Sequence, residues 1–240
     1  MKINEITDYI FEGETPTLAE QTGQWMIASA RFKEFMERHR DKIRKKRRGL
    51  QNNPLGVGDL LAEIGVAYRL LQDRRITLEY EYYTAAKVRG PDFTGAFRVN
   101  LAFNIEVARL HAIGRTVVTV QSKFTNVFCA KLSQFPAGII NVLLAEFAET
   151  APTAFGEHEL AQTMARLHAH ATRKDEAFFT QRGLEGVKEY QRLIPHVSAV
   201  LARLPTISSD GTPGARTLIW ANPQTKHPLS ADLSRALLSV

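Results

Sequence analysis

The chain has 240 residues, of which 44% are hydrophobic and 23% are charged, a composition typical of a folded protein and unlike that of a disordered or low-complexity chain. No apolar run approaches the roughly 20 residues that cross a bilayer, and a single cysteine, Cys129, excludes an internal disulfide framework and suits a reducing cytoplasm. The N-terminal segment MKINEITDYIFEGETP lacks an apolar core, so we expect no secretory signal, a cytoplasmic location and no membrane partner.

The positive charge is concentrated in one segment. The chain holds 31 Lys and Arg against 25 Asp and Glu, a net charge of +6, and the run RHRDKIRKKRR at 38–48 alone contributes +7. Such a cluster suits a nucleic-acid backbone, and a solvated helix face is the alternative. The residues expected to bind nucleic acid are Arg44, Lys45, Lys46, Arg47 and Arg48.

The first fifty residues are expected to be helical after an irregular lead over 1–15, because 17–47 carry apolar side chains near helical spacing. A loop rich in Asn, Pro and Gly then separates an N-terminal helical region, residues 1–50, from an α/β domain over 51–240. The next segment has the apolar stripe of a helix. Glu63 lies off the centre of that stripe, which is typical of a solvated residue.

Three strands are predicted next in the chain. The β-branched and aromatic segment ITLEYEYY at 76–83 predicts a strand with Glu79 and Glu81 on its solvent-facing side. A Gly-Pro break then precedes two further strands at 92–98 and 101–110.

The remaining elements alternate between helix and strand. A helix is predicted at 115–134, and the apolar run GIINVLLAEF at 138–147 predicts a strand buried on both faces. Helices at 157–171 and 183–193, strands at 196–204 and 217–220, and a short helix capped by Ser230 complete the order. This succession is typical of an α/β fold with a mixed sheet.

Two carboxylates fall on successive predicted strands. Asp92 follows Pro91 at the start of one strand, and Glu106 lies inside the apolar segment FNIEVARL of the next. Carboxylates on neighbouring strands can share a divalent cation, and a buried acidic residue needs a cation or an arginine to offset its charge. A turn residue at 92 and an exposed edge position at 106 are the ordinary alternatives.

The order helix, three strands, helix, strand, with Glu63 on the helix and Asp92 and Glu106 on the strands, resembles the restriction-endonuclease-like PD-(D/E)XK nuclease superfamily. The likeness spans about residues 57–230. The segments KLSQFPAGIINVLLAEF and WANPQTKHPL are also similar to uncharacterised bacterial members. The resemblance implies a restriction-endonuclease-like core, with a central mixed sheet flanked by helices and an N-terminal helical extension.

Carried over residue by residue, the resemblance implies that Asp92, Glu106 and Glu63 are catalytic residues that bind Mg²⁺ or Mn²⁺. It further implies the hydrolysis of phosphodiester bonds in nucleic acid, DNA more than RNA, by a metal-activated water. Cleavage of both strands of a duplex would favour a homodimer.

One position departs from the superfamily pattern. The superfamily has a lysine two residues after the glutamate, where this chain has Ala108, and the adjacent Arg109 points to the opposite face of the strand. Lys131 is taken as the catalytic lysine that replaces it, with Lys87 and Lys123 as alternatives. Gln134 is a candidate for orienting a water or a phosphate. The departure leaves open a catalytically inactive nuclease-fold subunit that binds nucleic acid or a partner protein.

Other chemistries receive less support from the sequence. His158, His168 and His170 suggest a transition-metal site, but residues two apart on a helix face different ways. Cys129 with His111 suggests a thiol nucleophile, although a lone cysteine is more often a core residue. P-loop, dinucleotide-binding and hydrolase-elbow motifs do not occur.

Overall fold

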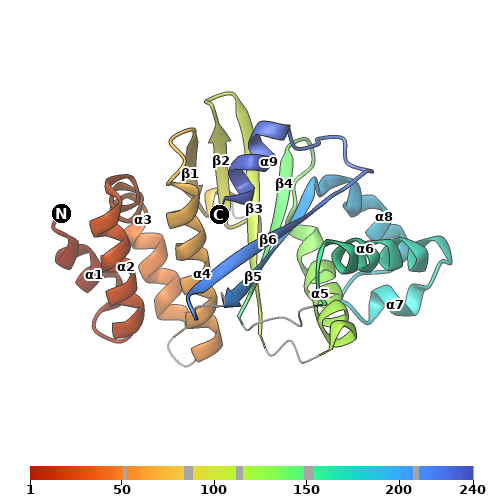
Figure 1. Cartoon of the computed structure of the whole chain (residues 1–240), viewed down its shortest axis with the longest axis horizontal. Coiled ribbons are helices and arrows are strands. Elements are labelled where there is room, and N and C mark those ends of the chain that lie inside the picture. The colour runs from red at the N-terminus through yellow and green to blue at the C-terminus, as the bar shows by residue number, and fades with distance from the viewer. Residues whose placement is uncertain (51–52, 84–88, 112–115, 149–153, 208–210, 240) are drawn as a thin grey trace.

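The computed structural model describes residues 1–50, 53–83, 89–111, 116–148, 154–207 and 211–239. A six-stranded sheet runs through the middle of the molecule, and helices lie on both sides of it (Figure 1). Neighbouring strands in the sheet are also neighbours in the chain, in the order β1 to β6. The strands are β1 (Ile76–Tyr80), β2 (Phe93–Phe97), β3 (Leu101–Leu110), β4 (Ile140–Phe147), β5 (Ala199–Ile207) and β6 (Pro213–Ala221).

The sheet is mixed, as the sequence predicts. β1, β2 and β3 form an antiparallel meander, β4 and β5 run parallel to β3, and β6 returns antiparallel to β5. Every residue of β4 is buried, which confirms the prediction from its continuous apolar run. The predicted α/β class, with a central mixed sheet flanked by helices and an N-terminal helical part, is therefore confirmed.

Four N-terminal helices lie on one side of the sheet. Residues 1–15 were expected to be irregular, and that prediction was wrong, because Ile6, Ile10 and Phe11 bury one face of a helix there. The long helix expected over 17–47 is interrupted at Ser29, whose hydroxyl accepts a hydrogen bond from Phe32 N at 3.3 Å. The N-terminal helices on this side are α1 (Ile3–Phe11), α2 (Pro16–Ala28), α3 (Ala30–Gly49) and α4 (Pro54–Leu70).

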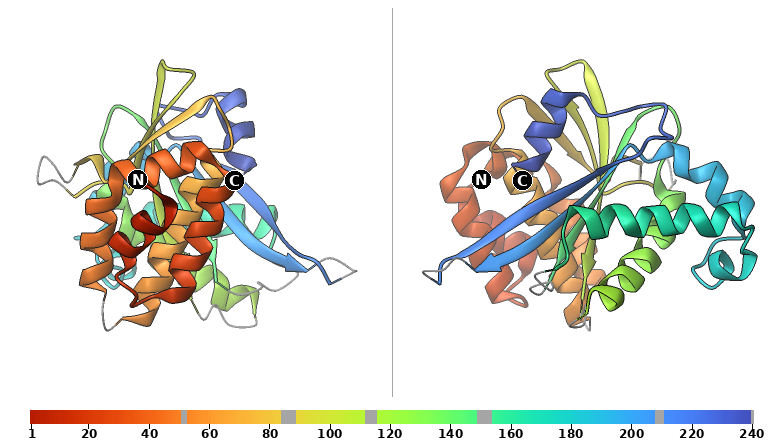
Figure 2. Two further views of the ribbon diagram at one scale, coloured as in Figure 1. Left: turned by 90° about the vertical axis from the view of Figure 1, so that its left-hand side faces the viewer. Right: turned by 45° about the vertical axis from the view of Figure 1, so that its right-hand side comes forward.

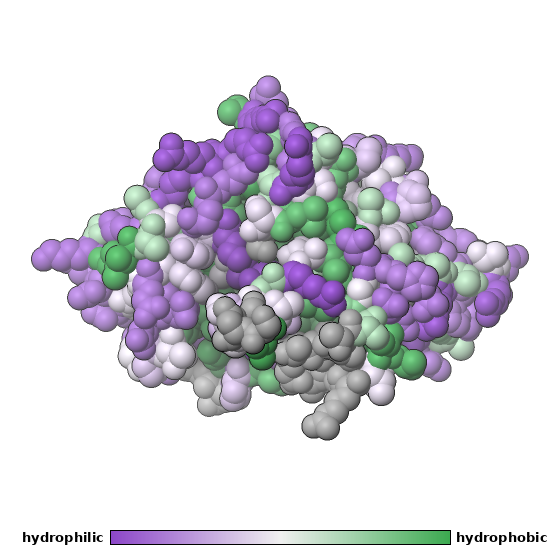
Figure 3. Space-filling model, in the orientation of Figure 1, coloured by the Kyte–Doolittle hydropathy of each residue, from purple (hydrophilic) through white to green (hydrophobic). Residues whose placement is uncertain are grey.

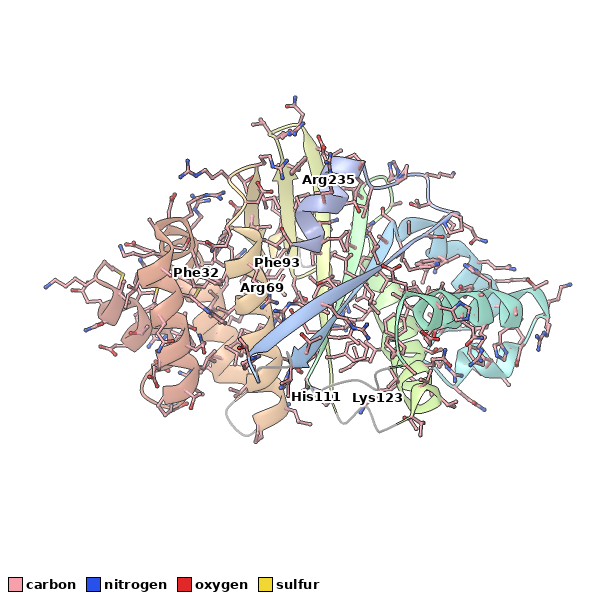
Figure 4. The ribbon with its side chains drawn as sticks, viewed as in Figure 1. Phe32, Arg69, Phe93, His111, Lys123 and Arg235 are labelled. Atoms are coloured by element: carbon pink, nitrogen blue, oxygen red, sulfur yellow. The ribbon has the colours of Figure 1, made fainter. Side chains whose placement is uncertain are left out.

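A single hydrophobic core joins these helices to the sheet. It includes Phe32 and Phe35 of α3, Ile64 of α4, and Phe93 of β2. The rings of Phe35 and Phe93 lie 6.3 Å apart, so α3 packs directly on the strand that follows Asp92. Figure 4 shows Phe32 among the N-terminal helices and Phe93 at the sheet. The N-terminal helical region and the sheet are thus packed as one body.

The opposite side of the sheet is covered by a second group of helices and a second core. Phe124 and Phe128 of α5 pack there against β4 and β5. The helix predicted at 183–193 begins only at Val187, and a short helix before it was not predicted. The elements on this side are α5 (Val117–Lys131), the 3-10 turn η2 (Leu132–Gln134), α6 (Glu157–Thr172), α7 (Glu176–Thr180), α8 (Val187–Leu193) and the 3-10 turn η3 (Ile194–His196).

The C-terminal part completes the sheet and returns to the first side. The start of β6 is exposed, and it projects together with the end of β5 beyond the helices in both views of Figure 2. The final helix, α9 (Ala231–Leu238), begins as predicted at Ser230, whose hydroxyl accepts a hydrogen bond from Leu233 N at 3.2 Å. The surface seen in Figure 3 is mainly hydrophilic, with hydrophobic side chains near its centre. Among the described residues, no helix is long and apolar enough to cross a membrane.

Candidate active site

Antiparallel pairing of β2 with β3 brings Asp92 beside Glu106. Phe93 lies opposite Ile105 in the register, so the residue that precedes β2 meets Glu106. Asp92 N donates a hydrogen bond to Glu106 Oε2 at 3.2 Å, and Val107 N donates one to Asp92 Oδ2 at 2.9 Å. The two carboxylates singled out in the sequence therefore lie at one point of the sheet.

Glu63 reaches the same place from α4. The sequence suggested a solvated residue, but only 6% of Glu63 is exposed, because α4 packs against β3 on one side and α3 on the other. The Tyr80 hydroxyl donates a hydrogen bond to Glu63 Oε2 at 2.7 Å. A carboxylate taken out of water needs such donors, and Glu63 is therefore a site residue rather than a surface one.

Lys46 lies among these carboxylates. Its Nζ is 2.7 Å from Glu63 Oε2, 3.3 Å from Asp92 Oδ1 and 3.5 Å from Glu81 Oε1. The sequence placed Lys46 with the nucleic-acid-binding residues and Glu81 on a solvent-facing strand edge. Instead, β1 ends at Tyr80 and Glu81 takes a positive φ of 47°, and its carboxylate reaches the ammonium of Lys46.

Lys131 supplies an ammonium to Glu106. Along β3, Ile105 and Val107 pack on the α4 side of the sheet, whereas Ala108 packs on the α5 side. Glu106 alternates in the same way as Ala108, and so it faces α5. Lys131, the last residue of α5, places Nζ 2.5 Å from Glu106 Oε1. Position 108 lacks a cation, and Lys131 supplies one from α5, the helix that packs on the same face of β3.

The other two lysine candidates, Lys123 and Lys87, are not seen in contact with Glu106 in the described structure. Lys123 lies two turns earlier on α5 and donates a hydrogen bond to the carbonyl oxygen of His111, beyond the end of β3. Figure 4 shows Lys123 and His111 together at the lower edge of the molecule. Lys87 falls outside the described residues.

Asp92, Glu106 and Glu63, together with Lys46 and Lys131, line a cleft of about 410 Å³, called here the carboxylate cleft. Its charged lining residues are five carboxylates and three cations, a formal charge of −2 among the described residues when every carboxylate is ionised. Gln134 also lines the cleft, and its Nε2 is buried without a hydrogen-bond partner in the described structure. The charged lining residues are Lys46, Asp59, Glu63, Glu81, Arg89, Asp92, Glu106 and Lys131.

The crowding of carboxylates perturbs their titration. Burial and the neighbouring charge of Asp92 raise the pKa of Glu106 to about 8, although Lys131 opposes the shift. Burial and Asp92 likewise raise the pKa of Glu63 to about 7, against the opposing effect of Lys46. Burial disfavours the charge of Lys46, but Asp92 and Glu63 outweigh it and raise the pKa of Lys46. Strongly perturbed groups inside a cleft are typical of a functional site.

The donor chemistry of the cleft suits a hard divalent cation. Mg²⁺ is usually held by one or two carboxylates together with waters and substrate phosphate, and Asp92 and Glu106 offer such a pair. A third ligand is not in place, because no group of three His, Cys, Asp or Glu side chains in the described part of the chain is arranged to hold a metal ion. The ammonium of Lys46 lies between Glu63 and Asp92 instead.

Most of the basic cluster is paired inside the molecule. Arg44, Arg47 and Arg48 all form ion pairs with Glu12, and Arg47 also pairs with Glu14. Only 1% of Arg47 is exposed. Lys45 is exposed and makes no ion pair within the described residues. We call Glu12, Glu14, Arg44, Arg47 and Arg48 the Glu12 cluster. Of the five residues expected to bind nucleic acid, Lys45 alone forms no ion pair with the described part of the chain.

The histidine and cysteine alternatives receive no geometric support. His168 contacts the Tyr190 hydroxyl at 3.2 Å, whereas His170 contacts Asp175 at 2.9 Å, so the two do not converge. Cys129 is buried, and burial raises the pKa of its thiol to about 12, which keeps it protonated and unreactive at neutral pH.

Comparison with known proteins adds no family assignment. No protein-family model matches the chain, and no curated protein matches it significantly.

Proposed function

We propose that this protein is a metal-dependent nuclease that hydrolyses phosphodiester bonds in nucleic acid, with DNA preferred over RNA. The observation that carries the proposal is the pairing of Asp92 and Glu106 on neighbouring strands, with Lys131 in contact with Glu106 inside the carboxylate cleft. The sheet order and the antiparallel β1–β2–β3 meander also support the PD-(D/E)XK resemblance.

Asp92 and Glu106 would hold the cation, Mg²⁺ or Mn²⁺. The bound cation would supply an activated water and offset negative charge on the phosphate. The excess of carboxylates over cations among the described lining residues supports this assignment, because a divalent ion offsets their mutual repulsion. Glu63, which bonds to Lys46 and Tyr80, acts by fixing Lys46 rather than as a direct ligand.

The chain's own residues can then position the reactants. Hydrolysis forms a bond between the water oxygen and phosphorus and breaks the bond from phosphorus to the leaving oxygen, which takes up a proton. The Lys131 ammonium, held by Glu106, can orient the attacking water and offset charge on the phosphate oxygens. Gln134 Nε2, which has no partner in the described structure, can donate a hydrogen bond to a phosphate oxygen or to the water.

The test is a cleavage assay with plasmid, linear duplex, single-stranded DNA and RNA, in Mg²⁺, Mn²⁺ or chelator. We expect metal-dependent cutting, and a loss of at least about 100-fold in Glu106→Gln, which removes the charge but keeps the side-chain volume. Glu34→Gln, an exposed residue of α3, is the matched control and should cut as the wild type does.

Two results would contradict the proposal, the first its catalytic site and the second its activity. One is equal cutting by Glu106→Gln and wild type, which would show that the activity lies elsewhere. The other is no cutting of any substrate by a folded protein, which would favour the inactive subunit that binds nucleic acid or a partner protein.

A further inference from the structure

We propose that Lys46 is a built-in cation of the carboxylate cleft, whose ammonium takes the place of a second divalent ion, so that the cleft loads a single metal ion. The inference rests on the proposed function, since it concerns how the same site is charged. It assigns to Lys46 a role inside the cleft in place of the nucleic-acid contact expected from the sequence.

The contacts of Lys46 are those of a bound cation. Its Nζ is within 3.5 Å of carboxylate oxygens from Glu63, Glu81 and Asp92, which come from three separate parts of the chain. The centre of the Tyr80 ring lies 5.5 Å from the same nitrogen. An aromatic face attracts an ammonium but offers no ligand to Mg²⁺, so this wall of the cleft suits lysine rather than a metal ion.

The helix that carries Lys46 is fixed on both sides of it. One turn earlier, Lys42 Nζ donates hydrogen bonds to the carbonyl oxygens of Tyr80 at 2.7 Å and Glu81 at 3.1 Å. On the other face of α3, the Glu12 cluster ties the last two turns to the segment after α1. Two independent sets of contacts therefore fix the position of Lys46. Its side chain loses little further conformational entropy when it holds the carboxylates of the cleft.

The charge of the cleft favours one additional divalent ion. With Lys46 in place and every lining carboxylate ionised, the formal charge of the described lining residues is −2, which one divalent ion balances and a second would turn to +2. Without the charge of Lys46 the sum is −3, and Glu63, Glu81 and Asp92 lose their shared cation. The three carboxylates do not form a metal-ligand set while the ammonium of Lys46 lies between them, and its removal leaves their oxygens to close on a second ion.

The experiment counts bound Mn²⁺ on the full chain by calorimetry and by electron paramagnetic resonance. We expect one Mn²⁺ per wild-type chain and two per Lys46→Met chain, with the second lost again when Glu63→Gln is added. Lys45→Met, which alters the exposed neighbour on the same helix, should bind one. Thermal unfolding of each variant confirms that it is folded.

The outcomes separate this inference from the proposed function. Two ions on the wild type, or one ion with unchanged affinity on both wild type and Lys46→Met, overturns the role of Lys46 while the metal site stands. No Mn²⁺ on any folded variant overturns the metal site itself, and both proposals with it. Should Lys46→Met fail to fold, Lys46→Gln and the wild-type stoichiometry decide the question.

Discussion

Tyr80 serves the carboxylate cleft with both parts of its side chain. Its hydroxyl donates to Glu63, and its ring faces the ammonium of Lys46. The strand predicted over 76–83 has Glu79 and Glu81 on its solvent-facing side, and the ring of Tyr80 between them packs 5.4 Å from that of Phe93. One buried tyrosine thus belongs to the core and to the site, a combination that a strand pattern alone does not distinguish from ordinary packing.

His39 is a second buried polar residue, and it makes stability depend on pH. Burial lowers the pKa of His39 to about 4; Glu79 opposes the shift, and Lys42 and Arg38 add to it. Between pH 6.5 and 4 the unfolded chain binds a proton that the folded chain does not. The free energy of unfolding should therefore fall as the pH falls through this window, by at most about 1.4 kcal/mol per pH unit from this residue.

Chemical denaturation of His39→Gln at several pH values measures this contribution. The variant should show a shallower loss of stability between pH 6.5 and 4 than the wild type, and the two should run parallel above pH 7. His158→Gln, at an exposed position, is the control and should keep the wild-type slope. Identical slopes for His39→Gln and wild type would show that the folded protein takes up the proton at His39 after all.

Helix α3 joins the N-terminal helices to the cleft. Its buried face carries Phe32 and Phe35 into the core, and its last two turns carry Lys46 and the arginines of the Glu12 cluster. Glu12 caps the C-terminus of α1 in a left-handed conformation, with φ of 52°. This places its carboxylate where three arginines of α3 reach it.

Replacing Glu12 should therefore weaken the whole junction between α1 and α3. Glu12→Gln leaves the buried Arg47 with Glu14 as its remaining carboxylate partner. Removing one partner of a buried pair costs several kcal/mol, and because Glu12 is partly exposed we expect a loss of about 2 kcal/mol in the free energy of unfolding. Denaturant titration measures it, with the exposed Glu20→Gln as control. A change below about 0.5 kcal/mol would mean that the cluster contributes little.

The elements that the sequence predicts best are those whose burial is complete. β4 appears where its continuous apolar run places it, because a strand buried on both faces needs no alternation. α1 was missed, since three buried side chains in nine residues form a helix only when α2 and α3 are present to cover them. α7 is only five residues long, too short to show a period.

Across the whole molecule, most basic residues of the 44–48 segment form ion pairs with carboxylates of the same chain. If five basic residues contacted duplex phosphates, the slope of log affinity against log salt would include about −4.5 from the cluster. Because four of them are engaged in ion pairs, we expect about −1, from Lys45 alone. Binding of a labelled duplex, measured in chelator at several KCl concentrations, tests this expectation.

Single substitutions show which charges matter for that binding. Lys45→Ala should make the slope less negative by about 0.9, whereas Arg48→Ala, whose guanidinium is paired with Glu12, should leave it nearly unchanged. Lys188→Ala, on α8 at the other side of the sheet, is the control. Equal effects of Lys45→Ala and Arg48→Ala would mean that nucleic acid displaces the internal ion pairs.

The candidate site was predictable where it depends on local order in the chain. Asp92 and Glu106 follow from a Gly-Pro break and a strand pairing between near neighbours in sequence. The position of Lys46 depends on how α3 packs against β1, and that of Glu81 on where β1 ends. Neither is encoded in a short segment, so a pattern of neighbouring residues could not have revealed them.

The way the cleft is assembled also determines how far the sequences of proteins with such a site can differ. Its ion-paired side chains come from α3, α4, the two ends of the connection between β1 and β2, β3, and α5, and no two of these charges are adjacent in sequence. Insertions in the connecting loops would change every interval between the charges and leave every distance in the cleft unchanged. A lysine on a helix can thus replace a lysine on a strand. Chains that share this geometry can therefore differ so much in sequence that no motif of fixed spacing identifies them.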